Sequence, residues 1–200
     1  MAEETEFAVA GGRRERKKAA TRQAIADTAL RLFLERGFEQ VSVRQIAEGA
    51  DVSVSTLFNY FPDGKEALVF DEDARNEAGF VLAVTDRRPG QSVPQALRAH
   101  LGGLINSAHA RDPRFAEFHR LVQDTPALRD YARRMWLRHE QALAGALTAQ
   151  TGRPDGDLLC AAYARFTLEV LAFASSTHDP AGAVDQACLL LEQGWTGAVS

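Results

Sequence analysis

Features that would point to a membrane protein or a disulfide-stabilised protein are missing from this 200-residue chain. Its two cysteines, Cys160 and Cys188, lie outside any CxxC or Cys/His ligand spacing, so we expect reduced core thiols. No apolar run approaches the roughly 18 residues that a membrane helix needs. The acidic start MAEETEFAVAGG also lacks the apolar segment of a signal peptide. We therefore expect a soluble, cytoplasmic protein with no membrane partner.

Catalytic and cofactor signatures are absent as well. The chain has no nucleophile elbow, no phosphate-binding glycine loop and no metal motif. Its five histidines form no HxxxH or HExxH pair, and we expect exposed or hydrogen-bonded structural histidines. The acidic run 71–73 is expected to be solvated rather than catalytic. These absences argue against an enzyme, a metal site and a bound cofactor.

Positive charge is concentrated near one end of an otherwise acidic protein. The formal net charge is −4, yet residues 13–22, RRERKKAATR, hold six basic residues and one acidic residue. Such a cationic segment suits contact with phosphate groups, whereas the net charge argues against nucleic-acid binding by the whole surface. The alternative is a disordered tail that only improves solubility.

Residues 42–61, SVRQIAEGADVSVSTLFNYF, predict two short helices joined by a tight turn. Ser42 is followed three residues later by Gln45, which is the spacing of a capping box. Asp51 tolerates a left-handed turn position, and Ser53 can cap the second helix. The segment therefore has the organisation of a helix-turn-helix unit.

The second of these helices has an outward face without charges. Leu57 and Phe61 lie four residues apart and can face inward. A merely solvated helix usually carries Lys and Glu on its outer face, whereas short uncharged side chains let a helix approach base edges. The outward residues are Val54, Ser55, Thr56, Asn59 and Tyr60.

The segment from Arg22 to Leu68 resembles the DNA-binding region of the TetR/AcrR family of transcriptional regulators. The agreement is carried by Arg22, Ile25, Ala29, Leu32-Phe33, Gly37-Phe38, Val41-Ser42-Val43, Ile46-Ala47, Ala50, Val52-Ser53, Thr56-Leu57-Phe58, Tyr60-Phe61, Lys65-Glu66 and Leu68. There are departures: Asp51 stands where the family usually has Gly, and Phe58 stands where it commonly has Tyr. Pro62-Asp63-Gly64 is one residue longer than the usual link, which could move Lys65 relative to a phosphate.

The side-chain chemistry and the resemblance together predict two groups of DNA-binding residues. Contacts to phosphate are expected from Arg22, Ser42, Tyr60 and Lys65, together with the cationic residues Arg13, Arg14, Arg16, Lys17 and Lys18. Contacts to bases are expected from Arg44, Val54, Ser55, Thr56 and Asn59. Phe58 belongs to the same surface but lacks the hydroxyl that would reach a phosphate.

The rest of the chain predicts more helices and no strands. Dipeptides of a capping residue and Pro, at Asp112-Pro113, Thr125-Pro126 and Asp179-Pro180, are typical of helix starts. We expect an all-α, nine-helix, TetR-like architecture, with helices over 15–36, two within 42–61, and others over 63–84, 92–109, 113–123, 126–150, 155–177 and 180–197. The expected domains are a flexible arm (1–14), a DNA-binding domain (15–61), a linking helix (62–84) and an effector-binding and dimerisation domain (85–200).

The last two expected helices carry wide apolar faces. Residues 158–174, LLCAAYARFTLEVLAFA, are apolar on most sides, which requires neighbours on several sides. One chain could bury both helices, or they could form the seam of a homodimer. The resemblance favours the dimer, because relatives pair their last two helices across a two-fold axis.

The resemblance also implies a pocket for a small apolar or amphipathic effector. Its candidate lining is Phe80, Leu104, Phe115, His119, Trp136, Tyr163, Phe166 and Thr167, and the alternative for each residue is an ordinary core position. The leading hypothesis is a homodimeric repressor that its effector releases from a palindromic double-stranded DNA operator. A DNA-binding regulator without an effector is the second hypothesis, and an all-α carrier or enzyme is the least favoured.

Overall fold

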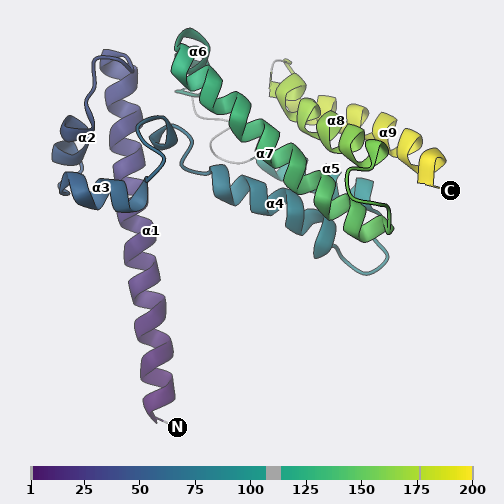
Figure 1. The fold of residues 1–200 in the computed structure, drawn as a ribbon, viewed down its shortest axis with the longest axis horizontal. Coiled ribbons are helices and arrows are strands. Elements are labelled where there is room, and N and C mark those ends of the chain that lie inside the picture. The colour runs from purple at the N-terminus through teal and green to yellow at the C-terminus, as the bar shows by residue number, and fades with distance from the viewer. Residues whose placement is uncertain (1, 107–113, 176, 200) are drawn as a thin grey trace. The chain divides into compact units, whose positions relative to one another are not determined.

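The computed structural model describes the backbone of residues 2–106, 114–175 and 177–199, and the side chains of residues 12–106, 117–174 and 177–194. Within these ranges every regular element is a helix, which confirms the expected all-α class with nine α-helices. The elements are α1 (Ala2–Arg36), α2 (Val43–Gly49), α3 (Val54–Tyr60), the 3-10 helix η1 (Glu66–Leu68), α4 (Asp73–Thr85), α5 (Val93–Asn106), α6 (Arg114–Asp124), α7 (Pro126–Thr151), α8 (Leu158–Ser175) and α9 (Pro180–Val199) (Figure 1).

The helices form two compact units. The head unit comprises Met1–Asp71 and Glu117–Tyr131, and the body unit comprises Glu72–Ala116 and Ala132–Ser200. Helix α7 contributes residues to both units. No described helix is both long enough and apolar enough to cross a membrane.

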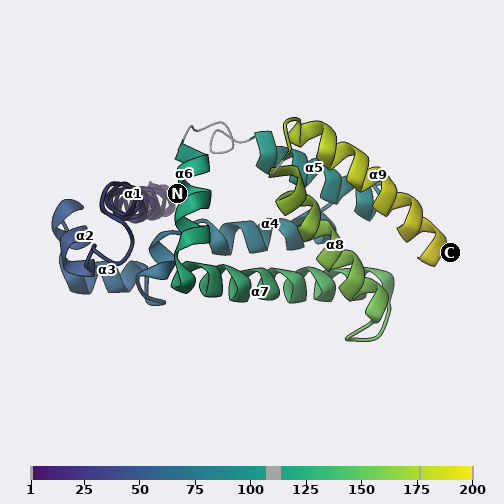
Figure 2. The same cartoon turned by 90° about the horizontal axis from the view of Figure 1, so that it is seen from above.

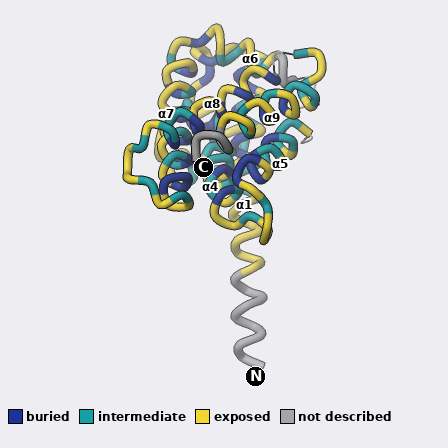
Figure 3. The backbone as a smooth tube through the Cα atoms, turned by 90° about the vertical axis from the view of Figure 1, so that its right-hand side faces the viewer, coloured by how far each residue is buried: buried dark blue, intermediate teal, exposed yellow. Residues whose placement is uncertain are grey.

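Helix α1 begins earlier than the sequence predicts, at Ala2 rather than near Glu15. The glycine pair at 11–12 lowers helix propensity by roughly 1 kcal/mol per residue but does not block a helix sterically as proline does. Residues 12–20 of α1 are exposed (Figure 3). Ile25, Ala29 and Phe33, further along the helix, are buried in the head unit. The helix ends before Gly37, whose φ of 83° supplies the left-handed position expected of it.

The helix-turn-helix unit has the predicted local chemistry. Ser42 and Gln45 form a reciprocal capping box at the start of α2. Ser53 caps α3 by accepting a hydrogen bond from the backbone N–H of Thr56. Asp51 has a φ of 53°, so the residue that replaces glycine in the turn does adopt the left-handed conformation. Buried Ile46 on α2 and Leu57 on α3 then anchor both helices in the head core.

The fourth helix does not begin near Asp63, as the sequence suggested, but at Asp73. Gly64 has a φ of 94°, which is incompatible with a first helical turn directly after Asp63. The intervening chain forms η1, in which Ala67 and Leu68 are buried. The expected capping pair of Asp63 and Glu66 therefore starts no α-helix.

The body unit is a layered bundle in which α4 packs on α5, and α5 and α8 pack on α9. Figures 1 and 2 show α8 and α9 side by side, and α4 alongside α7. Its buried core includes Phe80, Leu97, Leu101, Leu143, Leu147, Cys160, Ala164 and Val184. Only one face of α8 is buried in this chain, because Phe166 and Phe173 on the same helix are more than half exposed.

Candidate nucleic-acid interface

Helix α3 exposes an uncharged surface to solvent. Val54 is 39% exposed and Phe58 is 44% exposed, although both are large and apolar. Ser55 and Asn59 are exposed beside them, whereas Leu57 on the opposite side is fully buried. The predicted face of α3 is therefore accessible along its length, with Thr56 and Tyr60 half-buried at its edges.

Hydroxyl groups at the start of α3 form hydrogen bonds with one another. Ser53 Oγ lies 2.9 Å from Ser55 Oγ and 2.7 Å from Thr56 Oγ1. Among the described residues, the Asn59 amide has no hydrogen-bond partner. Asn59 thus offers an accessible donor and acceptor on this face, which is the pair that adenine matches.

Residues Ser42 and Arg44 lie at the start of α2. The Ser42 backbone N–H donates to Gln45 Oε1 at 2.8 Å, and its hydroxyl donates to the same oxygen at 2.9 Å. Arg44 Nε is 2.9 Å from Glu48 Oε1, but the Arg44 side chain is 82% exposed. Surface pairs of this kind contribute about 0–1 kcal/mol, so Arg44 can exchange Glu48 for a base or a phosphate at little cost.

Arg22 is half-buried, and its guanidinium has partners within the head unit. Its guanidinium donates to the backbone carbonyls of Tyr60 and Asp71, the latter at 3.2 Å. The guanidinium carbon is also 4.1 Å from the centroid of the Phe61 ring. The sequence predicts a phosphate contact for Arg22, but in the structure its donors hold α1 to the end of α3 and to the chain after η1.

Lys65 also has partners within the head unit. Its ammonium donates to the Phe38 carbonyl and lies 4.0 Å from the centroid of the Phe38 ring and 5.5 Å from that of Phe33. Burial lowers the pKa of Lys65, while nearby Glu39 and Glu66 oppose that shift. Lys65 directly follows the longer Pro62-Asp63-Gly64 link. Its contacts with Phe38 and Phe33 therefore hold the end of that link to the rest of the head unit.

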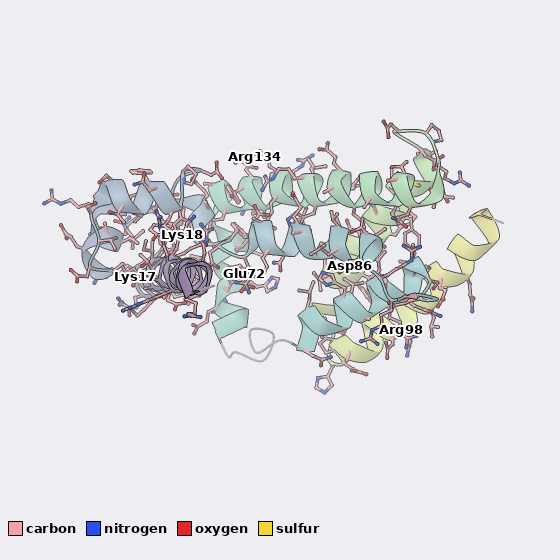
Figure 4. The ribbon with its side chains drawn as sticks, turned by 90° about the horizontal axis from the view of Figure 1, so that it is seen from below. Lys17, Lys18, Glu72, Asp86, Arg98 and Arg134 are labelled. Carbon is pink, nitrogen blue, oxygen red and sulfur yellow. The ribbon has the colours of Figure 1, made fainter. Side chains whose placement is uncertain are left out.

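The cationic residues near the start of α1 are free of such contacts. Arg13, Arg14, Arg16, Lys17 and Lys18 are all exposed, and Figure 4 shows Lys17 and Lys18 on α1. None of them forms an ion pair with another described residue. Their charges are therefore available to an external polyanion.

Most candidates for an effector pocket lie in the core of the body unit. Phe80 is 1% exposed, and Tyr163 and Thr167 are buried, with the Thr167 hydroxyl donating to the Tyr163 carbonyl at 2.8 Å. Leu104 and Trp136 are half-buried against the same core. Phe166 instead lies on the exposed face of α8.

Two further pocket candidates are not placed with this group. His119 is exposed and belongs to the head unit, where its ring lies 6.0 Å from that of Phe118. The Phe115 side chain lies outside the described residues. Two surface hollows in the described structure follow residues 85–92 and the α8–α9 surface, and neither of these two is lined by a predicted pocket residue.

The structure adds a polar cluster that the sequence did not reveal. His139 on α7 is 1% exposed, and its Nε2 lies 2.7 Å from Asp73 Oδ1 at the start of α4. Arg138 also donates to the Asp73 carboxylate. The expectation that the run 71–73 is simply solvated is therefore wrong for Asp73. No local signal could have shown this, because the partners are 66 residues apart in the chain.

Comparisons with known proteins agree with this architecture. The sequence model described as "Bacterial regulatory proteins, tetR family" matches residues 25–71, which contain α2, α3 and η1. The HTH-type transcriptional regulator TcmR of Streptomyces glaucescens is 34% identical over 154 residues, covering 70% of this chain and 65% of TcmR. The repressor KstR of Mycolicibacterium smegmatis is 34% identical over 97 residues, covering 48% of this chain and 47% of KstR.

The chain thus spans less than two thirds of the length of these two relatives. Among solved structures, Salmonella enterica GusR has a TM-score of 0.59 at 20% identity, covering 90% of this chain and 95% of GusR, so the two share a fold. The family comprises transcriptional regulators and not enzymes. The helix-turn-helix unit, the fold and these similarities together show that the chain belongs to the TetR family of bacterial transcriptional regulators.

Proposed function

We propose that this chain is a homodimeric repressor that binds a palindromic DNA operator and is released from it by an apolar or amphipathic small molecule. The observation that carries the proposal is the surface of α3, where an unpartnered Asn59 amide stands among exposed, uncharged side chains. A helix with such a surface suits the major groove, where base edges offer hydrogen bonds and thymine methyl groups.

Each exposed group has a role in this complex. Asn59 pairs with an adenine, Val54 and Thr56 contact thymine methyl groups, and Arg44 reaches a guanine or a phosphate. The exposed cations between Arg13 and Lys18 neutralise phosphates without selecting a sequence. Arg22 and Lys65 act indirectly, because their internal hydrogen bonds hold the head unit in shape.

A dimer is supported by the apolar surface that one chain leaves open on its last two helices. Leu158 is 82% exposed and Leu190 is 72% exposed, and Phe166, Phe173 and Leu189 are also exposed. Burying a large apolar side chain contributes about 1.5–3 kcal/mol, so a second copy covering this surface would be strongly favoured. A two-fold pair also presents two α3 helices, as a palindromic site requires.

Effector control is supported by the hydrogen bonds that join α4 to α7 in the body unit. Asp73 at the start of α4 is tied to α7 through His139 and Arg138, and α4 directly follows the head unit in the chain. A ligand that shifts α4 or α7 would change the placement of the heads and so disfavour the DNA-bound state. By linkage, ligand and DNA then weaken each other's binding equally, by about 1–3 kcal/mol for a typical coupling.

The DNA-binding part of the proposal is tested by selecting bound sequences from random duplex DNA with the purified chain. We expect two inverted half-sites whose centres lie one helical turn, about 10–10.5 base pairs, apart. Enrichment of an unrepeated half-site would contradict the dimer, and no enrichment would contradict sequence-specific binding. A regulator without an effector would give the same operator but no release by any small molecule.

A further inference from the structure

Phe58 is an exposed aromatic side chain within the helix-turn-helix unit. It is 44% exposed on α3, whereas Phe33, Phe38 and Phe61 in the same head unit are at most 4% exposed. No ring contact or cation–π contact joins Phe58 to another described residue. The ring therefore adds little to the head core, and its surface is available to a partner.

Two parallel rows of side chains run along the exposed face of α3. Val54 and Phe58 are four residues apart, as are Ser55 and Asn59, so the members of each pair lie on adjacent turns of one side of the helix. Successive residues of a helix differ by about 100° in direction, so the two rows are neighbours. One row is apolar and the other carries a hydroxyl and an amide, and all four side chains are exposed.

The chemistry of the major groove matches these two rows. Its apolar group is the 5-methyl group of thymine, and in an A·T pair this group shares the groove with the adenine N6 and N7 atoms that an asparagine amide can pair with. A phosphate group, by contrast, requires a charge or a hydrogen-bond donor, and a phenyl ring has neither. The apolar row beside Asn59 is therefore complementary to A·T base pairs.

We propose that Phe58 contributes to sequence selection by packing its ring against a thymine methyl group in each half-site, near the adenine that Asn59 contacts. The inference rests on the proposed binding of a palindromic operator, and it adds a specificity-determining residue and the group that this residue recognises. A helix with its side chains is about 10–12 Å across, and base pairs are about 3.4 Å apart. The thymine should therefore lie within about three base pairs of the adenine.

The test removes the methyl group from the DNA and leaves the protein unaltered. Once an operator has been selected from random duplexes, each thymine is replaced in turn by deoxyuridine, which lacks only the 5-methyl group. One buried methyl group corresponds to about a fourfold change in affinity, so the contacted thymine should show a loss of about 3- to 5-fold. Substitution in both half-sites should cost about 10- to 20-fold. Unchanged affinity at every thymine would overturn the proposal.

A variant assigns the methyl contact to Phe58. The F58A variant should bind the operator more weakly than the unaltered chain, and deoxyuridine at the contacted position should then change its affinity by less than about 1.5-fold. The control L137A, which removes a 48% exposed apolar side chain on α7, should keep both the affinity and the deoxyuridine effect. A full deoxyuridine effect in F58A would show that another residue contacts the methyl group and would overturn the assignment.

The same contact can be tested as a gain of affinity. Cytosine at the contacted position removes the methyl group, and 5-methylcytosine restores it without changing the base pair. The unaltered chain should bind the 5-methylcytosine duplex about 3- to 5-fold more tightly than the cytosine duplex, and F58A should bind the two equally. Equal binding of the two duplexes by the unaltered chain would contradict recognition of the methyl group.

The selection step separates this inference from the proposed function. If no sequence is enriched, sequence-specific binding is refuted, and this inference is refuted with it. An operator that binds equally well with thymine or deoxyuridine would refute this inference alone. If F58A weakens all duplexes alike while deoxyuridine has no effect, the ring packs on the sugar-phosphate backbone, and the role in sequence selection is overturned.

Discussion

Replacing Arg22 by methionine tests whether this residue contacts DNA phosphate or instead stabilises the head unit. The sequence predicts a phosphate contact, whereas the structure shows donation to the carbonyls of Tyr60 and Asp71 and a position 4.1 Å above the Phe61 ring. Methionine keeps the apolar stem but removes the charge and every donor. The R22M variant should therefore lose head stability if the internal contacts dominate.

The size of this loss follows from the contacts. A hydrogen bond to a charged group contributes about 1.5–3 kcal/mol, and a partly exposed cation–π contact adds about 0.5–1 kcal/mol. Solvent can reach the half-buried Arg22 and replace part of this energy, so we expect the free energy of unfolding to fall by about 2–4 kcal/mol.

The assay is urea denaturation followed by circular dichroism, together with the salt dependence of DNA binding. R22M should unfold at a lower urea concentration, and its slope of log affinity against log salt should stay within experimental error of the unaltered chain. The control R14M, in the exposed part of α1, should keep its stability and flatten the salt slope by about 0.9. An R22M variant that kept its stability and lost one unit of salt slope would refute the internal role and restore the phosphate contact.

The remaining predictions concern the body unit. Gly79→Ala should reduce the free energy of unfolding by about 1–3 kcal/mol, because the new methyl group collides with His100, and adding His100→Ala should make the combined loss smaller than the sum of the two single losses. Burial raises the pKa of Cys188 to about 11, so at pH 8 iodoacetamide should label it at least about 100-fold more slowly in the folded chain than in urea; equal rates would show an accessible thiolate. Leu190→Glu places a charge at an exposed apolar position, and light scattering should report a monomer with unchanged helix content, whereas a persistent dimer would exclude this surface as the interface.

Local chemistry in the sequence predicted the DNA-binding unit well. The capping box at Ser42, the cap at Ser53 and the left-handed turn at Asp51 depend on residues within a few positions of one another, and the structure confirms all three. Helical periodicity likewise identified Leu57 as buried, since one face of a short helix must join the head core.

Contacts between segments distant in the chain could not be predicted from the sequence. The start of α4 was misplaced because Asp63 and Glu66 have capping spacing, but Gly64 adopts a left-handed conformation between them. Asp73 looked like one of several solvated carboxylates until the fold brought His139 to it. Periodicity likewise could not separate the buried Tyr163 from the exposed Phe166 on the same apolar helix, because both faces of that helix are apolar.

The central claim, that the exposed face of α3 selects the DNA sequence, is tested most directly by comparing operator preferences with and without Asn59. Binding selection from random duplexes by N59A should show one position relaxed in each half-site, with a loss of about 1–3 kcal/mol on the preferred operator. The control Q141A, which removes an exposed amide on α7, should reproduce the preference of the unaltered chain. If N59A gave the same preference and affinity as Q141A, the account of this surface would be contradicted.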